Sequence, residues 1–167
     1  MLAAFVLAAV TASTGLRDVH YRQPPPDFGV PVAEGTARLS DWRGTPVVLN
    51  FWASWCKPCT DELHLFVRAE REYGTRIHLL TISSEPHDVA ASYLRLWNIS
   101  LPLLEDVDGS ISAEYDVPPI PVTVVIDRNG NVTYVSVGEL NWHELRSAIE
   151  ADLAPDPLGT PASRVLR

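Results

Sequence analysis

Residues 50–59 read NFWASWCKPC and contain both cysteines of the 167-residue chain, Cys56 and Cys59. This stretch continues an apolar run that starts at residue 46 and is typical of a central strand buried on both faces of a sheet. From residue 58 to residue 73 the apolar side chains take helical spacing instead, and Cys59 falls on the apolar face. The pattern predicts a buried strand that leads directly into a helix, with Cys56 where the helix begins and Cys59 more buried than Cys56.

The spacing of the two cysteines indicates chemistry rather than a structural bridge. A disulfide between positions so close together closes almost no loop, so it adds little stability. Thiol–disulfide exchange needs one thiolate near neutral pH and a second thiol that can displace the partner from a mixed disulfide. The N–H groups at a helix N-terminus and the neighbouring Lys57 are expected to lower the pKa of Cys56, and Pro58 suits a first helical turn. We interpret Cys56 as the attacking thiol and Cys59 as the resolving one.

Half of a zinc site is the alternative interpretation of a Cys-X-X-Cys motif, because such a site needs at least two further ligands. The sequence contains no second cysteine pair, and its five histidines are scattered singly. His64 is the only histidine on the same predicted helix, where we expect it to meet solvent. We therefore predict no metal and no other cofactor.

The rest of the first half continues the alternation of strands and helices. Residues 76–83 form a second apolar run of strand type, and residues 86–97 have helical spacing. The positions predicted to face inward from this helix are Val89, Tyr93, Leu94 and Trp97. A strand, a helix, a strand and a helix in this order are typical of a βαβ unit with parallel strands.

The second half has a different order of elements. A short helical turn is predicted at residues 110–115, followed by strands at residues 122–126 and 132–137 that a turn at residues 127–130 joins into a hairpin. Asn141 can cap a last helix. A βαβ half joined to a ββα half predicts an α/β, thioredoxin-like fold, with a central mixed β-sheet flanked by helices.

The composition changes at both ends of the chain. Residues 1–16 hold an apolar run that is too short to span a membrane and is followed by small residues, which predicts a signal peptide or the stub of a membrane anchor. A helix docked on the domain is the alternative. Residues 17–35 are predicted to be an extended Pro-rich lead-in, residues 36–154 the thioredoxin-like domain, and residues 155–167 a disordered tail.

The net charge of −8 limits the range of partners. A protein that binds nucleic acid neutralises phosphates with Lys and Arg, so we expect no nucleic acid partner. The same charge disfavours a purely electrostatic hold on anionic lipid. We also expect the chain to be a monomer.

Residues 50–59 closely resemble the active-site stretch of the TlpA/ResA-like thiol–disulfide oxidoreductases, which are thioredoxin-fold proteins exported or tethered outside the cytoplasm. The resemblance extends upstream to residues 26–28 and 39–44 and downstream to Pro121 and residues 125–130. It covers roughly residues 25 to 153 and therefore almost the whole predicted domain.

The resemblance implies roles for several further residues. Pro121 matches a cis proline that faces the active site, and the backbone of the preceding Ile120 would pair with an extended substrate segment. Glu62, three positions after the second cysteine, matches a carboxylate that tunes the pair or shuttles protons for it, the alternative being a solvated charge on the helix face. Trp55 is expected beside the exposed sulfur as part of the docking surface, whereas Trp52 is expected in the core.

The leading functional interpretation is a reductase that acts on disulfides of exported proteins, with the haem-site cysteines of apocytochrome c as one candidate substrate. Its electrons would come from a membrane thiol–disulfide carrier, and it would work in the periplasm or on the outer face of the cytoplasmic membrane.

Three alternatives stay open. A disulfide-donating oxidase would use the same atoms, because the reduction potential sets the direction of exchange. A peroxiredoxin-like peroxidase usually places a Pro-X-X-X-Thr-X-X-Cys motif around its cysteine, and Cys56 lacks that setting. A copper-binding thioredoxin-fold module typically carries Cys-X-X-X-Cys, which is one residue longer than the motif in this chain.

Overall fold

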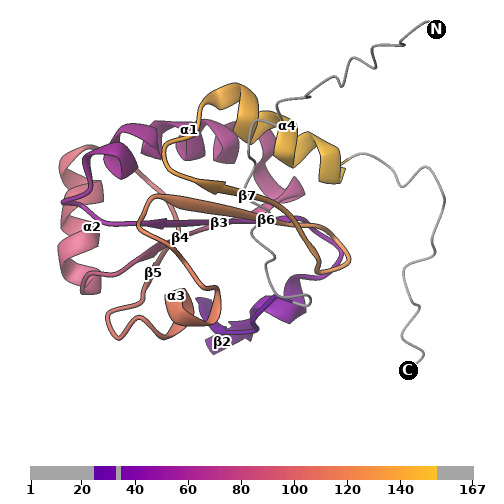
Figure 1. The fold of residues 1–167 in the computed structure, drawn as a ribbon, viewed down its shortest axis with the longest axis horizontal. Helices are drawn as coiled ribbons and strands as arrows, with labels where there is room; N and C mark the ends of the chain where they lie inside the picture. The colour runs from indigo at the N-terminus through magenta and orange to yellow at the C-terminus, as the bar shows by residue number, and fades with distance from the viewer. Residues whose placement is uncertain (1–24, 33–34, 154–167) are drawn as a thin grey trace, which may run out of the picture.

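The computed structural model describes residues 25–32 and 35–153 of the chain. Within them a mixed sheet in the order β5-β4-β3-β6-β7 forms the centre of the molecule, and β1 and β2 pair separately (Figure 1). The strands are β1 Gly29–Val32, β2 Gly35–Arg38, β3 Val47–Trp52, β4 His78–Ser83, β5 Leu103–Glu105, β6 Val122–Ile126 and β7 Val132–Val137. The helices are α1 Lys57–Tyr73, α2 His87–Leu96, α3 Ser110–Glu114 and α4 Trp142–Leu153, with short 3-10 helices η1 Leu39–Trp42 and η2 Gly74–Arg76. This order of elements confirms the predicted α/β fold.

Strand β3, which leads to the cysteines, lies in the middle of the sheet with every residue buried. It runs parallel to β4 and antiparallel to β6, so both of its edges are paired. Its side chains alternate between the two faces of the sheet. Val47, Leu49 and Phe51 belong to one apolar cluster, and Val48 and Trp52 belong to two further clusters on the other face. Burial on both faces and both edges explains why the sequence is a continuous apolar run here.

Different elements cover the two faces of the sheet (Figure 1). On one face, Phe66 of α1 and Leu145 of α4 share an apolar cluster, and Leu63 of α1 and Leu94 of α2 share another. The β1–β2 hairpin, η1 and Tyr115 after α3 cover the opposite face. Helix α1 is therefore held between β3 and two other helices, and its N-terminus lies at the edge of the sheet where β3 ends.

The described part of the Pro-rich lead-in belongs to the domain. Residues 29–32 pair with residues 35–38 as a hairpin, and Phe28 and Val30 are buried in the core. The hydroxyl of Tyr115 donates to the carbonyl oxygen of Pro26 at 3.0 Å. The predicted boundary at residue 36 is therefore too late, because alternate apolar side chains on this side already contribute to the core.

Helix α2 begins and ends close to the prediction, but a different face points inward. Its buried residues are Ala90 and Leu94, whereas Val89 and Trp97 are 43% and 62% exposed. Tyr93 is half-buried and its ring lies beside Trp97. The prediction that Val89 and Trp97 face inward is wrong, because the small Ala90 makes the close contact that a count of large apolar residues misses.

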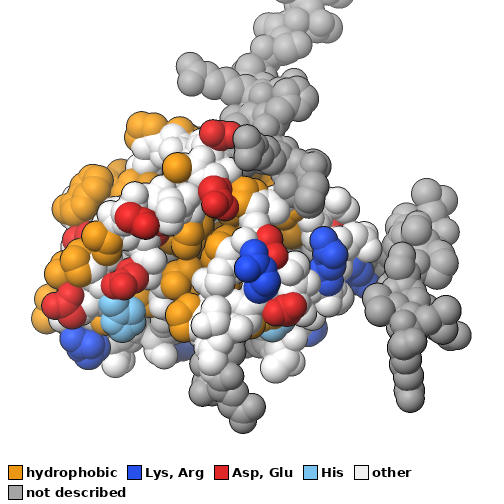
Figure 2. All heavy atoms as spheres, turned by 90° about the horizontal axis from the view of Figure 1, so that it is seen from below, with side chains coloured by type: hydrophobic (Ala, Val, Ile, Leu, Met, Phe, Trp, Pro, Cys, Tyr) orange, Lys and Arg blue, Asp and Glu red, His pale blue; other side chains and the backbone are white. Residues whose placement is uncertain are grey.

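The predicted segments at the two ends, residues 1–16 and 155–167, lie outside the described residues (Figure 2). No helix within residues 25–32 and 35–153 is both long enough and apolar enough to cross a membrane. Helix α4 starts as predicted, since the side-chain oxygen of Asn141 accepts the N–H of Glu144 at 3.1 Å.

Candidate active site

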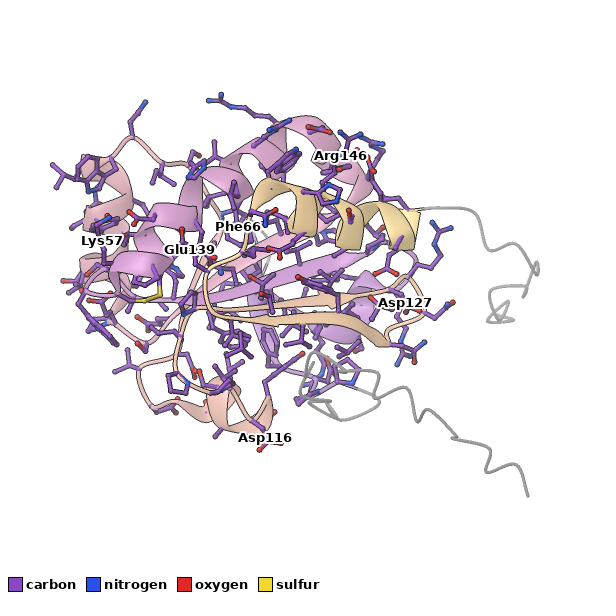
Figure 3. The ribbon with its side chains drawn as sticks, turned by 45° about the horizontal axis from the view of Figure 1, so that its top comes forward. Lys57, Phe66, Asp116, Asp127, Glu139 and Arg146 are labelled. Atoms are coloured by element: carbon purple, nitrogen blue, oxygen red, sulfur yellow. A yellow bond between two sulfur atoms is a disulfide. The ribbon has the colours of Figure 1, made fainter. Side chains whose placement is uncertain are left out.

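The two cysteines are joined by a disulfide at the N-terminus of α1 (Figure 3). Cys56 is the N-cap residue of the helix, and its sulfur accepts the backbone N–H of Cys59 at 3.4 Å. Pro58 lies in the first turn, where its missing N–H leaves no hydrogen bond unmade. Cys59 is fully buried and Cys56 is 6% exposed, as predicted. Cys56 is thus the sulfur that a partner can reach.

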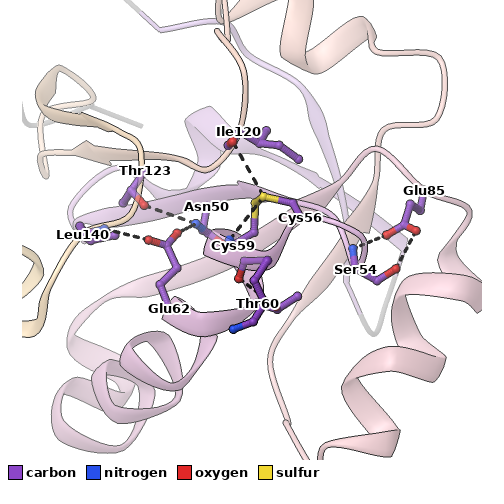
Figure 4. Close-up of a disulfide and its surroundings, with 11 residues drawn as sticks. Asn50, Ser54, Cys56, Cys59, Thr60, Glu62, Glu85, Ile120, Thr123 and Leu140 are labelled. Atoms are coloured by element: carbon purple, nitrogen blue, oxygen red, sulfur yellow. Dashed lines mark hydrogen bonds between the residues drawn. A yellow bond between two sulfur atoms is a disulfide. The ribbon is translucent and has the colours of Figure 1, made fainter.

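A tight turn connects β3 to Cys56. The N–H of Cys56 donates to the carbonyl oxygen of Ala53 at 3.1 Å, and Trp55 at the corner of this turn is 71% exposed, as predicted. Ser54, the other corner residue, donates both its N–H and its hydroxyl to the carboxylate of Glu85, at 2.6 and 2.8 Å (Figure 4). Glu85 lies between β4 and α2 and has no sequence motif of its own.

The segment before β6 faces the disulfide from across the site. The bond between Ile120 and Pro121 is cis, as the family resemblance implies. The carbonyl oxygen of Ile120 lies 3.8 Å from the sulfur of Cys56 (Figure 4). The backbone of Ile120 therefore lies next to the sulfur of Cys56, the less buried of the two cysteines.

Glu62 is a buried carboxylate on the next turn of α1, with only 1% of its surface exposed. One of its oxygens accepts the side-chain amide of Asn50 at 2.9 Å, and the other accepts the N–H of Leu140 at 3.0 Å (Figure 4). The same amide of Asn50 also donates to the hydroxyl of Thr123 at 3.3 Å. A solvated charge on the helix face, the alternative considered for Glu62, is therefore wrong.

The environment of Glu62 changes its acidity. Burial raises its pKa from 4.5 to about 7, and the hydrogen bonds from Leu140 and Asn50 only partly oppose this effect. A carboxyl group with this pKa can both hold and release a proton at neutral pH. The position of Glu62 on α1 was readable from the sequence, but its partners come from β3 and from the loop before α4.

Lys57, the cation next to Cys56, is paired with another side chain. Its ammonium group contacts the carboxylate of Asp61 one turn further along α1, and both side chains are largely exposed. This hydrogen bond is the main cause of the raised pKa of Lys57. The charge that was expected to stabilise the thiolate of Cys56 is therefore partly neutralised.

The histidines of the described residues do not join the cysteines in a metal-binding group. Within the described residues no group of three or more His, Cys, Asp or Glu side chains is arranged to hold a metal ion. His64 is exposed on α1, with its Nδ1 atom 2.6 Å from the carbonyl oxygen of Asp61. The geometry at Cys56 and Cys59 is that of a thiol pair at a helix N-terminus.

Comparisons with known proteins agree with this geometry. Residues 21–135 match the model of the AhpC/TSA family. The thiol-disulfide oxidoreductase ResA of Geobacillus thermodenitrificans is 30% identical over 129 residues, which are 75% of this chain and 74% of that protein.

Two solved structures extend the comparison. A Chlorobium tepidum protein described provisionally as thiol:disulfide interchange protein DsbE is 29% identical, with a TM-score of 0.70 over 78% of this chain and 96% of that one. An exposed lipoprotein thioredoxin of Streptococcus pneumoniae is 28% identical, with a TM-score of 0.62 over 75% of this chain and 99% of that one.

Proposed function

We propose that this chain, which belongs to the AhpC/TSA family and is a thiol–disulfide oxidoreductase of the ResA type, works as a reductase outside the cytoplasm. In this direction the thiolate of Cys56 attacks a disulfide of the substrate and forms a mixed disulfide, which releases the first substrate thiolate. Cys59 then attacks the sulfur of Cys56 and releases the second. Two electrons pass to the substrate, and the Cys56–Cys59 disulfide remains.

The charges around Cys56 are the observation that supports the reductase direction of exchange. A pair becomes strongly oxidising when its reduced form is stabilised, as happens when nearby cations hold the thiolate. Here the N–H groups of α1 favour the thiolate, but Lys57 is paired with Asp61. We infer a thiolate with moderate stabilisation and hence a reducing pair.

Glu62 is assigned a role in moving the proton of Cys59. The resolving cysteine has to lose its proton before it can attack the mixed disulfide, and a buried thiol ionises poorly on its own. Glu62 lies one helical turn after Cys59 and has a pKa of about 7, so it can accept that proton at neutral pH. When the pair is reduced again, the same carboxyl group can return the proton.

The substrates and partners follow from the same proposal. An extended segment of an exported protein would lie along the carbonyl of Ile120 and against the exposed ring of Trp55, with its disulfide at Cys56. The haem-site cysteines of apocytochrome c are the substrate class to test first. A membrane thiol–disulfide carrier would supply the electrons to a monomer of this chain. The name of the pneumococcal relative, an exposed lipoprotein, supports a location outside the cytoplasm.

The reduction potential of the Cys56–Cys59 pair tests the direction. We expect equilibration in glutathione and dithiothreitol buffers to give a value near that of thioredoxin, about −270 mV. A value near about −120 mV, as in a strong periplasmic oxidant, would sink the reductase proposal and make the chain a disulfide donor.

A further inference from the structure

Glu85 contacts the redox site from a neighbouring strand. Strands β3 and β4 are parallel, and their last paired residues are Trp52 and Ser83. Ser54 and Glu85 each lie two positions beyond this pair, so the register alone places them side by side at the same edge of the sheet. The carboxylate of Glu85 accepts two hydrogen bonds from Ser54, one from the backbone and one from the hydroxyl (Figure 4).

These two bonds fix the turn that presents Cys56. Ser54 and Trp55 are the corner residues between Ala53 and Cys56, whose carbonyl and N–H close the turn. Hydrogen bonds to a carboxylate are about twice as strong as those between neutral groups, and two of them hold the orientation of Ser54 as well as its position. The path by which the chain enters the N-cap of α1 therefore depends on Glu85.

The charge of Glu85 also differs from the other charges near the cysteines. Lys57 and Asp61 form an ion pair on α1, whereas Glu85 takes part in none of the ion pairs found among residues 25–32 and 35–153. Its partners at Ser54 are neutral donors, so no positively charged side chain of the described residues pairs with its negative charge beside the turn that leads into α1. A negative charge in this place opposes the formation of a second one on Cys56.

We propose that Glu85 is a positioning residue of the redox pair: it fixes the turn before Cys56, and its charge makes the pair more reducing. The inference deepens the proposed reductase function, because it gives the negative charge that favours that direction. The first effect depends on the hydrogen bonds to Ser54 and the second on the charge of the carboxylate, so different substitutions can separate them.

Glu85→Gln removes the charge and keeps one side-chain acceptor for Ser54. In the full chain we expect the pKa of Cys56, followed by thiolate absorbance in the reduced protein, to fall. The equilibrium constant for reduction by glutathione should rise roughly three- to tenfold, the size expected for a charge screened by partly polar surroundings. Ser54→Ala keeps the charge and loses one bond, so its equilibrium constant should stay within about twofold while the exchange rate falls severalfold.

Glu105→Gln is the matched control, because the carboxylate of Glu105 accepts the N–H of His87 in the adjacent turn and has no contact with Ser54 in the described residues. The proposal is overturned if Glu85→Gln changes the equilibrium constant no more than Glu105→Gln does. If Glu85→Gln folds poorly, Glu85→Asp retains the charge and should keep the equilibrium constant of the wild type, so a shift in that variant also overturns it. The value for the wild type tests the reductase proposal, whereas the differences between variants test Glu85.

Discussion

Helices α1 and α4 begin in similar ways but use different atoms at their first turn. At α4, the side chain of Asn141 accepts the N–H of Glu144, and the carboxylate of Glu144 accepts the N–H of Asn141 at 2.9 Å. This reciprocal pair is a capping box, and it satisfies the N–H groups of Asn141 and Glu144 with side chains of the same two residues. At α1 the corresponding place is taken by the sulfur of Cys56, which accepts the N–H of Cys59.

The difference shows how one helix start serves stability and another serves chemistry. The side-chain oxygen of Asn141 is a strong acceptor for the N–H of Glu144, so the start of α4 is already stabilised by its own cap. A sulfur at 3.4 Å is a weaker acceptor, so the positive end of α1 stays available to a thiolate. One hydrogen bond connects the two helices near their starts: the carboxylate of Glu62 in α1 accepts the N–H of Leu140, the residue before Asn141.

The largest expected effect comes from replacing the sulfur of Cys56 at the start of α1 by an oxygen. Cys56→Ser should fold, because Ser is a good N-cap residue, but disulfide exchange should fall by roughly a thousandfold or more for lack of a thiolate nucleophile. The measurement is reduction of a protein disulfide, with circular dichroism to follow folding. Asn141→Ser makes the comparable change at α4 and should leave turnover unaltered. Persistent exchange by Cys56→Ser would remove Cys56 from the role of attacking thiol.

An intermediate effect is expected from Glu62, which connects the two helix starts. Because its pKa in the folded protein is raised from 4.5 to about 7, the folded state binds the proton more tightly than the unfolded state. Stability from this group is therefore complete below pH 4.5 and is lost as the pH rises through about 7, by roughly 3 kcal/mol in total.

Glu62→Gln should remove this dependence, so urea unfolding of the oxidised protein at pH 5 and at pH 8 is the measurement. The wild type should lose more free energy of unfolding between these values than the variant does. Glu144→Gln, a change of the same type in the cap of α4, should keep the slope of the wild type. Equal slopes for wild type and Glu62→Gln would contradict a raised pKa.

The smallest effect is expected at α4. Asn141→Ala removes the side-chain oxygen that holds the first turn and should cost about 1 kcal/mol in the free energy of unfolding. Exchange activity should stay within about twofold of the wild type, since the side chain of Asn141 hydrogen-bonds to Glu144 at the start of its own helix. A larger loss of activity without a matching loss of stability would show that the start of α4 acts on the redox pair through Leu140.

The sequence was sufficient for the parts of the molecule that depend on local pattern. The strand before Cys56, the helix after it and the cap at Asn141 follow from periodicity and from the chemistry of single residue types. The short strand β5 was not predicted, because residues 103–105 are too few to establish a pattern. The hairpin that starts at Gly29 was also missed, since Pro31 lies within its first strand.

In the candidate site, the residues that lie close together in the sequence could be predicted, whereas contacts between distant residues could not. Cys56 and Cys59 lie three positions apart in the sequence, whereas the partners of Glu62 are separated from it by 12 positions at Asn50 and by 78 at Leu140. Helical spacing places Glu62 on the same face as Cys59 and Phe66, but its charge made a solvated position an equal alternative, and its distant partners cannot be identified from local sequence. Glu85 is equally hidden, although the parallel register of β3 and β4 would have placed it beside Ser54 once the strand ends were known.

The antiparallel pairing of β3 with β6 has a consequence for the order in which the protein folds. Strand β4 follows β3 after one helix, but β6 pairs with it only after a connection of about 70 residues, and contacts this distant in sequence form slowly. We expect the βαβ half to form first, before Ile120 and Leu140 arrive. During folding, the cysteines would first be part of an incomplete sheet. The contacts of Ile120 with Cys56 and of Leu140 with Glu62, which set the environment of the redox pair, would form in the last step.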